Sequence, residues 1–474
     1  MTRRVLPTTL TSVIAAAAAG GLVAAAAPVA ASAAPTPAVS GGTTATAKVC
    51  GTTRVVRRVA AGAAVRFTVP AARQARVRAA RAGSTVVVER CEAGRWTALR
   101  TLRLGARATA LSGPLTGASD TAADLRVRVR SRGGAFGRAA HVRVGVGEVV
   151  DVPVSFRVVN RNRTALPCLG APDGKTYTVR GTLVGPRAVL DAGKAAATLY
   201  LHGLGYSGDL FFRFRDVPGY DYPLQQAQAG HVSVVVDRLG NPAHDDLPDG
   251  NATCFPAQAD MADQMVRHLR AGTFDAPGAA RRFDRVVLAG HSAGGLITEL
   301  TQHAFKSADA IAVIGYTDTP SPLTLATFAV AGGDCLTAPQ RARGVTGAPG
   351  YAPFGRTNAD FAAGHFHDID PTVVKLVLAR HNRDACGDLL GALQSLAGNV
   401  LLTRTITAPV LIISGSRDAL FAPPTNTLAA ATAFTGSPDV ALVELPGTGH
   451  AVTLGRTREA FRSAMDAWLA RHGA

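Results

Sequence analysis

Hydrophobic and polar positions follow two different patterns along this chain. Before about Val150, apolar and polar residues alternate over short stretches, as in Leu125–Arg130, where three arginines share one strand face. From Val152 onward, short runs rich in β-branched residues alternate with longer helical stretches such as Gln258–Arg270. We therefore predict a small antiparallel β-sandwich at residues 48–150, followed by a mostly parallel α/β domain at residues 151–474.

The second region contains eight predicted strands. The first two are closely joined and are expected to be antiparallel, whereas helices separate the later ones. The strands are Val154–Val159, Tyr177–Leu183, Thr198–Leu201, Val232–Val236, Arg285–Leu288, Ala310–Ile314, Val410–Ile413 and Val440–Leu445.

The connection between the sixth and seventh predicted strands is much longer than a simple crossover requires. We interpret residues 317–408 as an insertion that forms a cap. Its apolar, helix-prone pieces are Leu323–Val330, Pro371–Arg380 and Leu389–Leu396, and they are candidates either for a pocket lining or for the core of the cap itself.

The fifth predicted strand ends in the motif G-H-S-A-G at residues 290–294, and a helix is predicted from Ala293 to Phe305. A sharp strand–turn–helix junction exposes the serine hydroxyl and leaves the N–H of the following residue free to receive an anion. The flanking glycines leave room for a strained turn. Because the chain has 50 glycines, this motif can occur by chance. The predicted strand before it and the predicted helix after it are what support a functional interpretation. Ser292 is therefore a candidate nucleophile.

Three further loops follow other predicted strands. The third strand is followed by H-G-L-G at residues 202–205, the seventh by G-S-R-D at 415–418, and the eighth by P-G-T-G-H at 446–450. The chain has 12 histidines, so one histidine in one loop means little by itself. Ser292, Asp418 and His450 after the fifth, seventh and eighth strands form a much less accidental series. With these four sites, residues 151–474 resemble the α/β-hydrolase fold.

This resemblance implies roles for particular residues. Ser292 is the expected nucleophile, His450 the general base and Asp418 the triad acid, in the chain order that the fold uses. Asp318, just after the sixth strand, is an alternative acid, because some members of the fold place it there. The N–H groups of Leu204 and Ala293 are the expected oxyanion donors.

The function implied is hydrolysis of carboxylic esters by a serine hydrolase, through an acyl-enzyme and without a cofactor. A serine at residue 292 argues against the dehalogenase and epoxide-hydrolase branches of the fold. Lipase, thioesterase, peptidase and carbon–carbon hydrolase activities stay open, as does an idle domain in an envelope-binding protein. The segment H-F-H-D-I-D at 365–370 superficially suggests a metal site, but we interpret it as a solvated loop and expect no metal.

Residues 1–33 have the pattern of a secretory signal peptide. Arg3 and Arg4 precede the apolar stretch Val13–Ala27, and Ala31-Ser32-Ala33 offers a small-residue cleavage site. The alternative is an uncleaved anchor, which the short stretch and Pro28 disfavour. We predict a secreted, extracellular protein without a transmembrane anchor after cleavage, and a flexible linker at residues 34–47.

Because export exposes the cysteines to an oxidising compartment, we predict that they form disulfides. Six cysteines allow 15 connectivities, among which sequence alone does not choose. Proximity favours Cys50–Cys91 and Cys335–Cys386, with Cys168–Cys254 by elimination.

Charge is divided sharply along the chain. Residues 48–150 contain 20 Lys and Arg residues and five acids, a net charge of +15 within a total of +17. A basic strand face can hold a protein near anionic envelope polymers, although a simply solvated face is the alternative. We do not expect this region to recognise nucleic acid specifically, because its sequence lacks aromatic residues for base stacking and a helix that could read a groove. The hairpin around Trp96 bears a faint resemblance to Ig-like β modules of secreted bacterial proteins.

Overall fold

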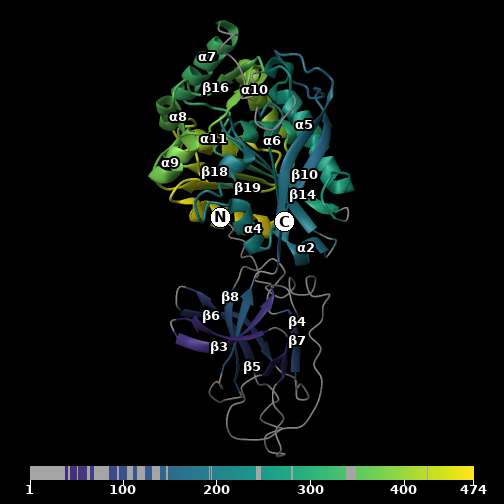
Figure 1. The fold of residues 1–474 in the computed structure, drawn as a ribbon, viewed down its shortest axis with the longest axis vertical. Helices are drawn as coiled ribbons and strands as arrows, with labels where there is room; N and C mark the ends of the chain where they lie inside the picture. The colour runs from purple at the N-terminus through teal and green to yellow at the C-terminus, as the bar shows by residue number, and fades with distance from the viewer. Residues whose placement is uncertain are drawn as a thin grey trace, which may run out of the picture. The chain divides into compact units, whose positions relative to one another are not determined.

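The computed structural model divides by its internal contacts into two units, Met1–Gly147 and Glu148–Ala474 (Figure 1). The predicted signal peptide lies outside the described residues. These are 38–40, 43–50, 52–60, 64–68, 85–92, 95–103, 110–114, 123–130, 139–145, 148–191, 193, 195–241, 247–278, 281–337, 348–423 and 425–473.

The described residues of the first unit form two sheets. A three-stranded sheet has the order β1 (Ala38–Ser40), β4 (Ala64–Thr68), β7 (Ala110–Pro114). A six-stranded sheet has the order β2 (Thr43–Val49), β3 (Thr52–Ala60), β9 (Ala140–Gly145), β8 (Ala123–Arg130), β5 (Thr85–Glu92), β6 (Arg95–Arg103). All pairs are antiparallel except β3 with β9.

The segment expected to be a flexible linker differs from that expectation. Residues 38–40 form β1, and residues 43–47 belong to β2, which pairs with β3 from Thr43 opposite Arg58 onward. Threonine-rich sequence suits a strand, and pairing supplies partners for its backbone N–H and C=O groups.

The arginine face of β8 carries an internal counter-ion. Arg126 and Arg128 both make paired hydrogen bonds to the buried carboxylate of Glu89, at 2.6–2.9 Å. The Arg126 guanidinium also lies over the Trp96 ring, 4.6 Å from its centroid. Part of the basic surface predicted from the sequence is thus neutralised within the unit.

The second unit is built on the predicted eight-stranded sheet. Its order is β10 (Val149–Val159), β11 (Thr176–Pro186), β13 (Ser233–Val236), β12 (Ala195–Leu201), β14 (Phe283–His291), β15 (Ala310–Ile314), β18 (Val410–Gly415), β19 (Val440–Leu445). β11 is antiparallel to both β10 and β13, and all later pairs are parallel. The predicted fold class is confirmed.

Helices cover both faces of this sheet because successive strand residues point to opposite sides. On β12, Leu199 and Leu201 enter one hydrophobic core while Tyr200 enters the other. α5 (Phe255–Ala271) and α6 (Ala293–Phe305) pack in the first core, and α4 (Tyr222–Ala229) and α12 (Arg458–Arg471) in the second. The shorter elements are α2 (Arg187–Asp191), α3 (Gly208–Phe211), η1 (Gly250–Ala252), η2 (Thr403–Thr405) and α11 (Thr425–Ala433).

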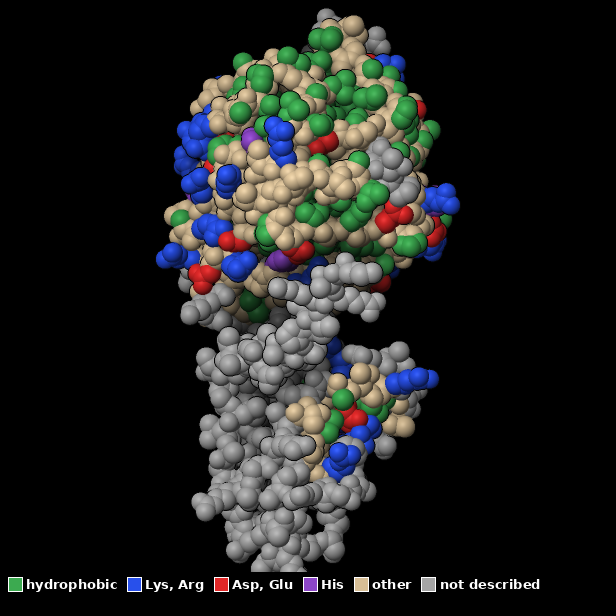
Figure 2. Space-filling model, turned by 180° about the vertical axis from the view of Figure 1, so that it is seen from behind, with side chains coloured by type: hydrophobic (Ala, Val, Ile, Leu, Met, Phe, Trp, Pro, Cys, Tyr) green, Lys and Arg blue, Asp and Glu red, His purple; other side chains and the backbone are tan. Residues whose placement is uncertain are grey.

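The long connection between β15 and β18 forms its own group of elements. It contains α7 (Pro322–Thr337), β16 (Tyr351–Pro353), α8 (Asn358–His365), α9 (Pro371–Leu378), β17 (Arg383–Ala385) and α10 (Cys386–Leu402). Large exposed apolar side chains are frequent on α7 and α10, and Figure 2 shows apolar side chains gathered at the end of the unit that carries α7. These side chains are Leu323, Leu325, Val330, Leu336, Leu393, Val400 and Leu401. Within the described residues, no helix combines the length and hydropathy needed to span a bilayer.

Three disulfides connect the cysteines in the predicted pairs. They are Cys50–Cys91, Cys168–Cys254 and Cys335–Cys386. The first lies in the β unit, and the third ties α7 to the start of α10.

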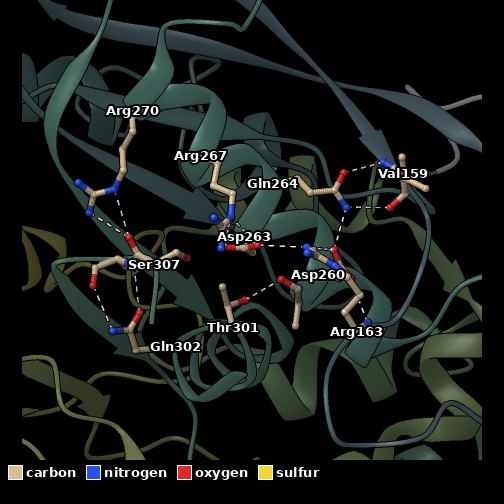
Figure 3. A network of polar contacts seen from close by, with 12 residues as sticks. Val159, Arg163, Asp260, Asp263, Gln264, Arg267, Arg270, Thr301, Gln302 and Ser307 are labelled. Carbon is tan, nitrogen blue, oxygen red and sulfur yellow. Dashed lines mark hydrogen bonds and ion pairs between the residues drawn. The ribbon is translucent and has the colours of Figure 1, made fainter. Parts of the chain in front are cut away.

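A polar network stabilises α5 against the start of the second unit (Figure 3). The carboxylate of Asp260, fully buried, accepts hydrogen bonds from the backbone N–H and guanidinium of Arg163 at 2.7–2.9 Å. Gln264 on the same helix also donates to Asp260 and bonds both backbone groups of Val159 on β10.

We predict that Asp260→Asn lowers the free energy of unfolding by about 2 kcal/mol, because it weakens hydrogen bonds to a charged group. Urea unfolding followed by helical circular dichroism measures this, since all described helices lie in the second unit. Asp334→Asn is the control: its partner Arg356 is mostly exposed, so the change should stay within about 1 kcal/mol. Equal effects of the two substitutions would contradict the prediction.

Candidate active site

Ser292 occupies a strained turn between β14 and α6. Its backbone has φ 55° and ψ −120°, in a region that residues with a Cβ rarely adopt. The Ser292 N–H donates to the carbonyl of Ile314 at 2.8 Å, and its own carbonyl accepts from Gly295 and Leu296. The serine side chain makes no hydrogen bond that caps α6. The turn is thus fixed by backbone hydrogen bonds, and the Ser292 hydroxyl is not needed to stabilise the helix.

Close backbone contacts explain the glycines on both sides of this turn. A Cβ at residue 290 would lie 1.9 Å from the carbonyl oxygen of Gly294. A Cβ at residue 294 would lie 2.3 Å from the carbonyl oxygen of Leu201, at the end of β12. A side chain at either position would push apart the strand and helix that hold Ser292.

Asp418 and His450 form a buried pair. Both follow neighbouring strands, β18 and β19, and His450 Nδ1 lies 2.8 Å from Asp418 Oδ2. The other carboxylate oxygen of Asp418 accepts from the N–H groups of Leu420 and Phe421, at 2.9 and 3.2 Å. With the carboxylate as acceptor, Nδ1 carries the proton of the neutral imidazole, so that Nε2 is left as a base.

The loop that carries His450 is braced from two sides. A Cβ at residue 415 would lie 2.3 Å from the carbonyl oxygen of Thr448, which accounts for a glycine directly after β18. The buried His291 ring donates from Nε2 to the carbonyl of His450 at 3.1 Å, and the two rings lie 4.6 Å apart. Burial, with the nearby His450 and His365, holds the pKa of His291 well below its ordinary value. His291 is therefore a neutral brace.

Several polar groups near this pair have no partner within the described residues. His450 Nε2 is buried and unpaired, so a hydrogen bond from Ser292 is not formed in this structure. The N–H groups of Leu204 and Ala293 also lack a hydrogen-bond acceptor in the described part of the chain. Ala293 is the first residue of α6, where N–H groups have no partner inside the helix.

An apolar pocket lies beside Ser292. The wall of this pocket is almost entirely hydrophobic. Two of the three predicted cap pieces contribute to it, α7 through Phe328 and α10 through Ala392 and Leu396, whereas α9 packs into the second core. The remaining lining residues are Leu204, Phe255, Ala293, Leu296, Tyr316, Thr324, Phe354, Leu420 and Phe421.

A family model described as the alpha/beta hydrolase family matches residues 199–464. The chain belongs to this family. The resemblance seen in the sequence is confirmed, and membership supports a hydrolase activity. No curated protein sequence matches the chain significantly.

Solved structures with a similar fold share little sequence with this hydrolase. A thermophilic esterase from Thermogutta terrifontis is 16% identical, with a TM-score of 0.45, over 67% of this chain and 100% of that one. A monoacylglycerol lipase from Paleococcus ferrophilus is 18% identical, with a TM-score of 0.44, over 59% and 96%. An enol-lactonase from Burkholderia xenovorans LB400 is 14% identical, with a TM-score of 0.42, over 62% and 97%.

The alternative acid of this hydrolase, Asp318, lies in a different environment from Asp418. Asp318 accepts from Tyr316 OH at 2.7 Å and from the amide of Asn399 at 2.7 Å. The same amide donates to Glu299 on α6 at 2.6 Å, so the buried carboxyl group of Glu299 and the half-buried one of Asp318 share one partner from α10. Burial and the charge of Asp318 raise the pKa of Glu299 well above its ordinary value. Through Asn399 this pair joins the cap helix α10 to α6, and it is separate from the His450 contact.

One segment of the hydrolase differs from its prediction as a solvated loop. His367 and Asp368 are exposed, but His365 is the last residue of α8 and is 2% exposed. Its Nδ1 lies 3.1 Å from Tyr206 OH, and its ring contacts that of His450 edge-on at 5.0 Å. The histidine-rich sequence drew attention to this segment, but it does not show which of its histidines is buried. That depends on how α8 packs against the loop that carries His450.

We predict that Glu299→Gln makes the stability of the protein less dependent on pH. An acid whose pKa is raised on folding stays protonated in the folded state, while the unfolded glutamate ionises near 4.5. Wild-type stability should therefore fall as pH rises above that value. The glutamine can still accept from Asn399 and does not ionise, so this part of the fall should disappear.

Urea midpoints measured from about pH 5 to about pH 8 test this prediction. Glu444→Gln, at an exposed position on β19, is the matched control and should leave the slope unchanged. An unaltered slope in Glu299→Gln would contradict the assignment of a protonated Glu299.

Proposed function

We propose that this protein is a secreted serine hydrolase that cleaves carboxylic esters through an acyl-enzyme on Ser292. The observation that carries the proposal is the buried hydrogen bond between His450 and Asp418, on the sheet edge where the Ser292 turn opens beside an apolar pocket. The strained turn at Ser292 supports it further, since its hydroxyl is not used to stabilise the helix.

In the proposed mechanism, His450 Nε2 takes the proton of Ser292 as Oγ attacks the acyl carbon of the ester. The carbonyl electrons move to oxygen, and the N–H groups of Leu204 and Ala293 hold that oxyanion. The tetrahedral intermediate collapses, and His450 gives its proton to the departing alcohol. Asp418 keeps the imidazole in the required tautomer and stabilises the imidazolium.

Deacylation repeats these steps with water. His450 takes a proton from the water as it attacks the acyl carbon, and the same two N–H groups hold the second oxyanion. The carboxylic acid leaves, and Ser292 recovers its proton from His450. In this scheme each turnover consumes one ester and one water, and the residues of this chain carry the protons.

The pocket supports a preference for esters with an apolar acyl group. Its hydrophobic lining favours burial of methylene groups, each of which contributes about 0.8 kcal/mol when removed from water. The exposed apolar side chains of α7 and α10 are consistent with substrates of low solubility. A panel of esters, thioesters and peptides ranks this class against the other acyl hydrolases of the fold and against a catalytically idle domain.

Extracellular localisation is part of the proposal. The signal-like residues 1–33 and the three disulfides support it, since disulfides persist in oxidising compartments. We further propose that the basic module at residues 48–150 contacts anionic envelope polymers, supported by its net charge of +15.

We predict that a fluorophosphonate probe labels Ser292, as located by mass spectrometry, and that Ser292→Ala loses the adduct and at least about 10³-fold of ester turnover. Asp418→Asn should lower kcat by about 10⁴-fold, because the wrong histidine tautomer then faces the serine. Asp318→Asn is its matched control and should cost less than about 10-fold. Labelling of another residue, or a larger loss in Asp318→Asn, would refute the assignments.

We predict that Ala392→Leu shifts selectivity toward short acyl groups. Ala392 lines the pocket from α10, and the added atoms occupy space that a long acyl chain needs. The ratio of kcat/KM for an octanoyl ester to that for an acetyl ester should fall at least about 10-fold. The adjacent Leu393 is largely exposed and does not line the pocket, so Leu393→Met should leave the ratio unchanged. An unchanged ratio in Ala392→Leu would place the acyl group elsewhere.

A further inference from the structure

The loop after β12 is held in place by groups outside it. The carbonyl of His202 accepts from Arg238 Nε at 2.9 Å. The N–H of Gly205 donates to both oxygens of the Asp384 carboxylate, at 3.0 and 2.9 Å. The carbonyl of Gly205 accepts from the Asn382 N–H at 2.8 Å. Both ends of the His202–Gly205 loop are therefore anchored.

These anchors enclose the peptide that carries the Leu204 N–H. Peptide units are planar, so a bond to the His202 carbonyl orients the unit before that peptide, and a bond from the Gly205 N–H orients the unit after it. Gly205 itself has φ +74°, and a Cβ there would lie 2.4 Å from the Phe361 ring. The direction of the Leu204 N–H is left with little freedom.

The anchor at Gly205 comes from the cap. Asp384 lies on β17, which pairs with β16, and Cys386 of the third disulfide is two residues further along the chain. Arg238, from the loop after β13, connects the two parts: its Nε holds the His202 carbonyl while its NH1 lies 3.2 Å from Asp388 of α10. The His202–Gly205 loop and the cap thus share one buried polar cluster.

The cluster contains two acids close to one arginine. Asp384 is 5% exposed and Asp388 is 2% exposed. A buried carboxylate is costly unless its hydrogen bonds are well made. Both carboxylate oxygens of Asp384 accept from a single backbone N–H, that of Gly205. The nearby Arg238 forms its ion pair with Asp388 rather than with Asp384. The strong interaction of Asp384 is therefore with the loop, which is what a group that fixes loop geometry requires.

We propose that Asp384 is a positioning residue of the reaction: through the Gly205 N–H it holds the Leu204 N–H in the direction needed to stabilise the oxyanion. This inference rests on the proposed function. It makes the cap part of the catalytic apparatus, in addition to its place in the pocket wall.

If Asp384 positions the loop through its charge, its contribution to kcat depends on pH, whereas a contribution from packing alone does not. Burial, opposed by the Gly205 N–H and Arg238 and reinforced by Asp388, raises the pKa of Asp384 to about 7. Burial also raises the pKa of Asp388 to about 6. Above about pH 7 the Asp384 carboxylate is charged and holds the loop; below it, protonation weakens the bond to Gly205.

The test compares Asp384→Asn and Asp384→Ala with the wild type on a short-chain ester. We expect kcat to fall about 10- to 100-fold in Asp384→Asn and further in Asp384→Ala, with KM changed less than about 3-fold, since a lost oxyanion donor costs 10²–10³. The ratio of wild-type to Asp384→Asn kcat should rise with pH through about 7. Affinity for a trifluoromethyl ketone, whose adduct bears the oxyanion, should fall in parallel with kcat/KM.

Asp260→Asn is the matched control, because it replaces a buried, hydrogen-bonded aspartate that does not contact the loop. It should lower stability and leave kcat unchanged. A folded Asp384→Asn enzyme whose kcat falls no more than that of Asp260→Asn overturns the proposal, as does a kcat ratio independent of pH.

If Asp384→Asn does not fold, Asp388→Asn tests the same idea with Asp384 in place. Loss of the Asp388 charge should move the pH dependence of kcat to lower pH, and an unmoved profile counts against the proposal. Failure of the proposed function is distinguishable: an unlabelled wild-type Ser292 rejects the function itself, whereas a labelled wild type with fully active Asp384 variants rejects only the positioning role.

Discussion

The turn at Ser292 sets the geometric demands on its surroundings. A non-glycine residue at φ 55° and ψ −120° is unfavourable and persists only where neighbouring structure enforces it. Here the enforcement comes from the parallel sheet. The Ser292 N–H bonds to β15, Gly294 packs on the end of β12, and the backbone of Gly290 lies against Gly294. Three adjacent strands therefore have to be in register before the serine can be held.

The same constraint brings the other polar groups together. Parallel strands end on one sheet edge, so the loops after β12, β14, β18 and β19 meet although they are far apart in sequence. His291 contributes to two of these loops. It lies inside the serine turn, yet its ring donates to the carbonyl of His450 and thereby connects the loop after β14 to the loop after β19.

The cap is attached to the rest of the second unit through polar groups as well as apolar contacts. Asn399 bonds both Glu299 and Asp318, while Asp384 bonds Gly205. Such groups are costly to bury, but their directional bonds define one arrangement where apolar packing tolerates several. The disulfide between Cys335 and Cys386 adds a covalent constraint within the cap.

The sequence by itself determined the elements and the order of the motifs. Runs such as Val286–Leu288, a helix from Ala293, and glycine-flanked loops after successive strands are local patterns, and local sterics and hydrophobic periodicity suffice to recognise them. Proximity along the chain also indicated two of the three cysteine pairs, and elimination left the third. The strands at residues 38–40 and 43–47 were missed because threonine- and alanine-rich sequence is equally compatible with a linker.

Only the tertiary structure decided which polar residues meet. Asp418 and Asp318 each follow a strand on the same sheet edge, and sequence order does not separate a carboxylate that bonds His450 from one that bonds Tyr316. The burial of His365 and the bond from Gly205 to Asp384, 179 residues away, depend on how the cap folds back over the sheet. Such contacts arise from packing between distant segments, for which no local pattern carries a signal.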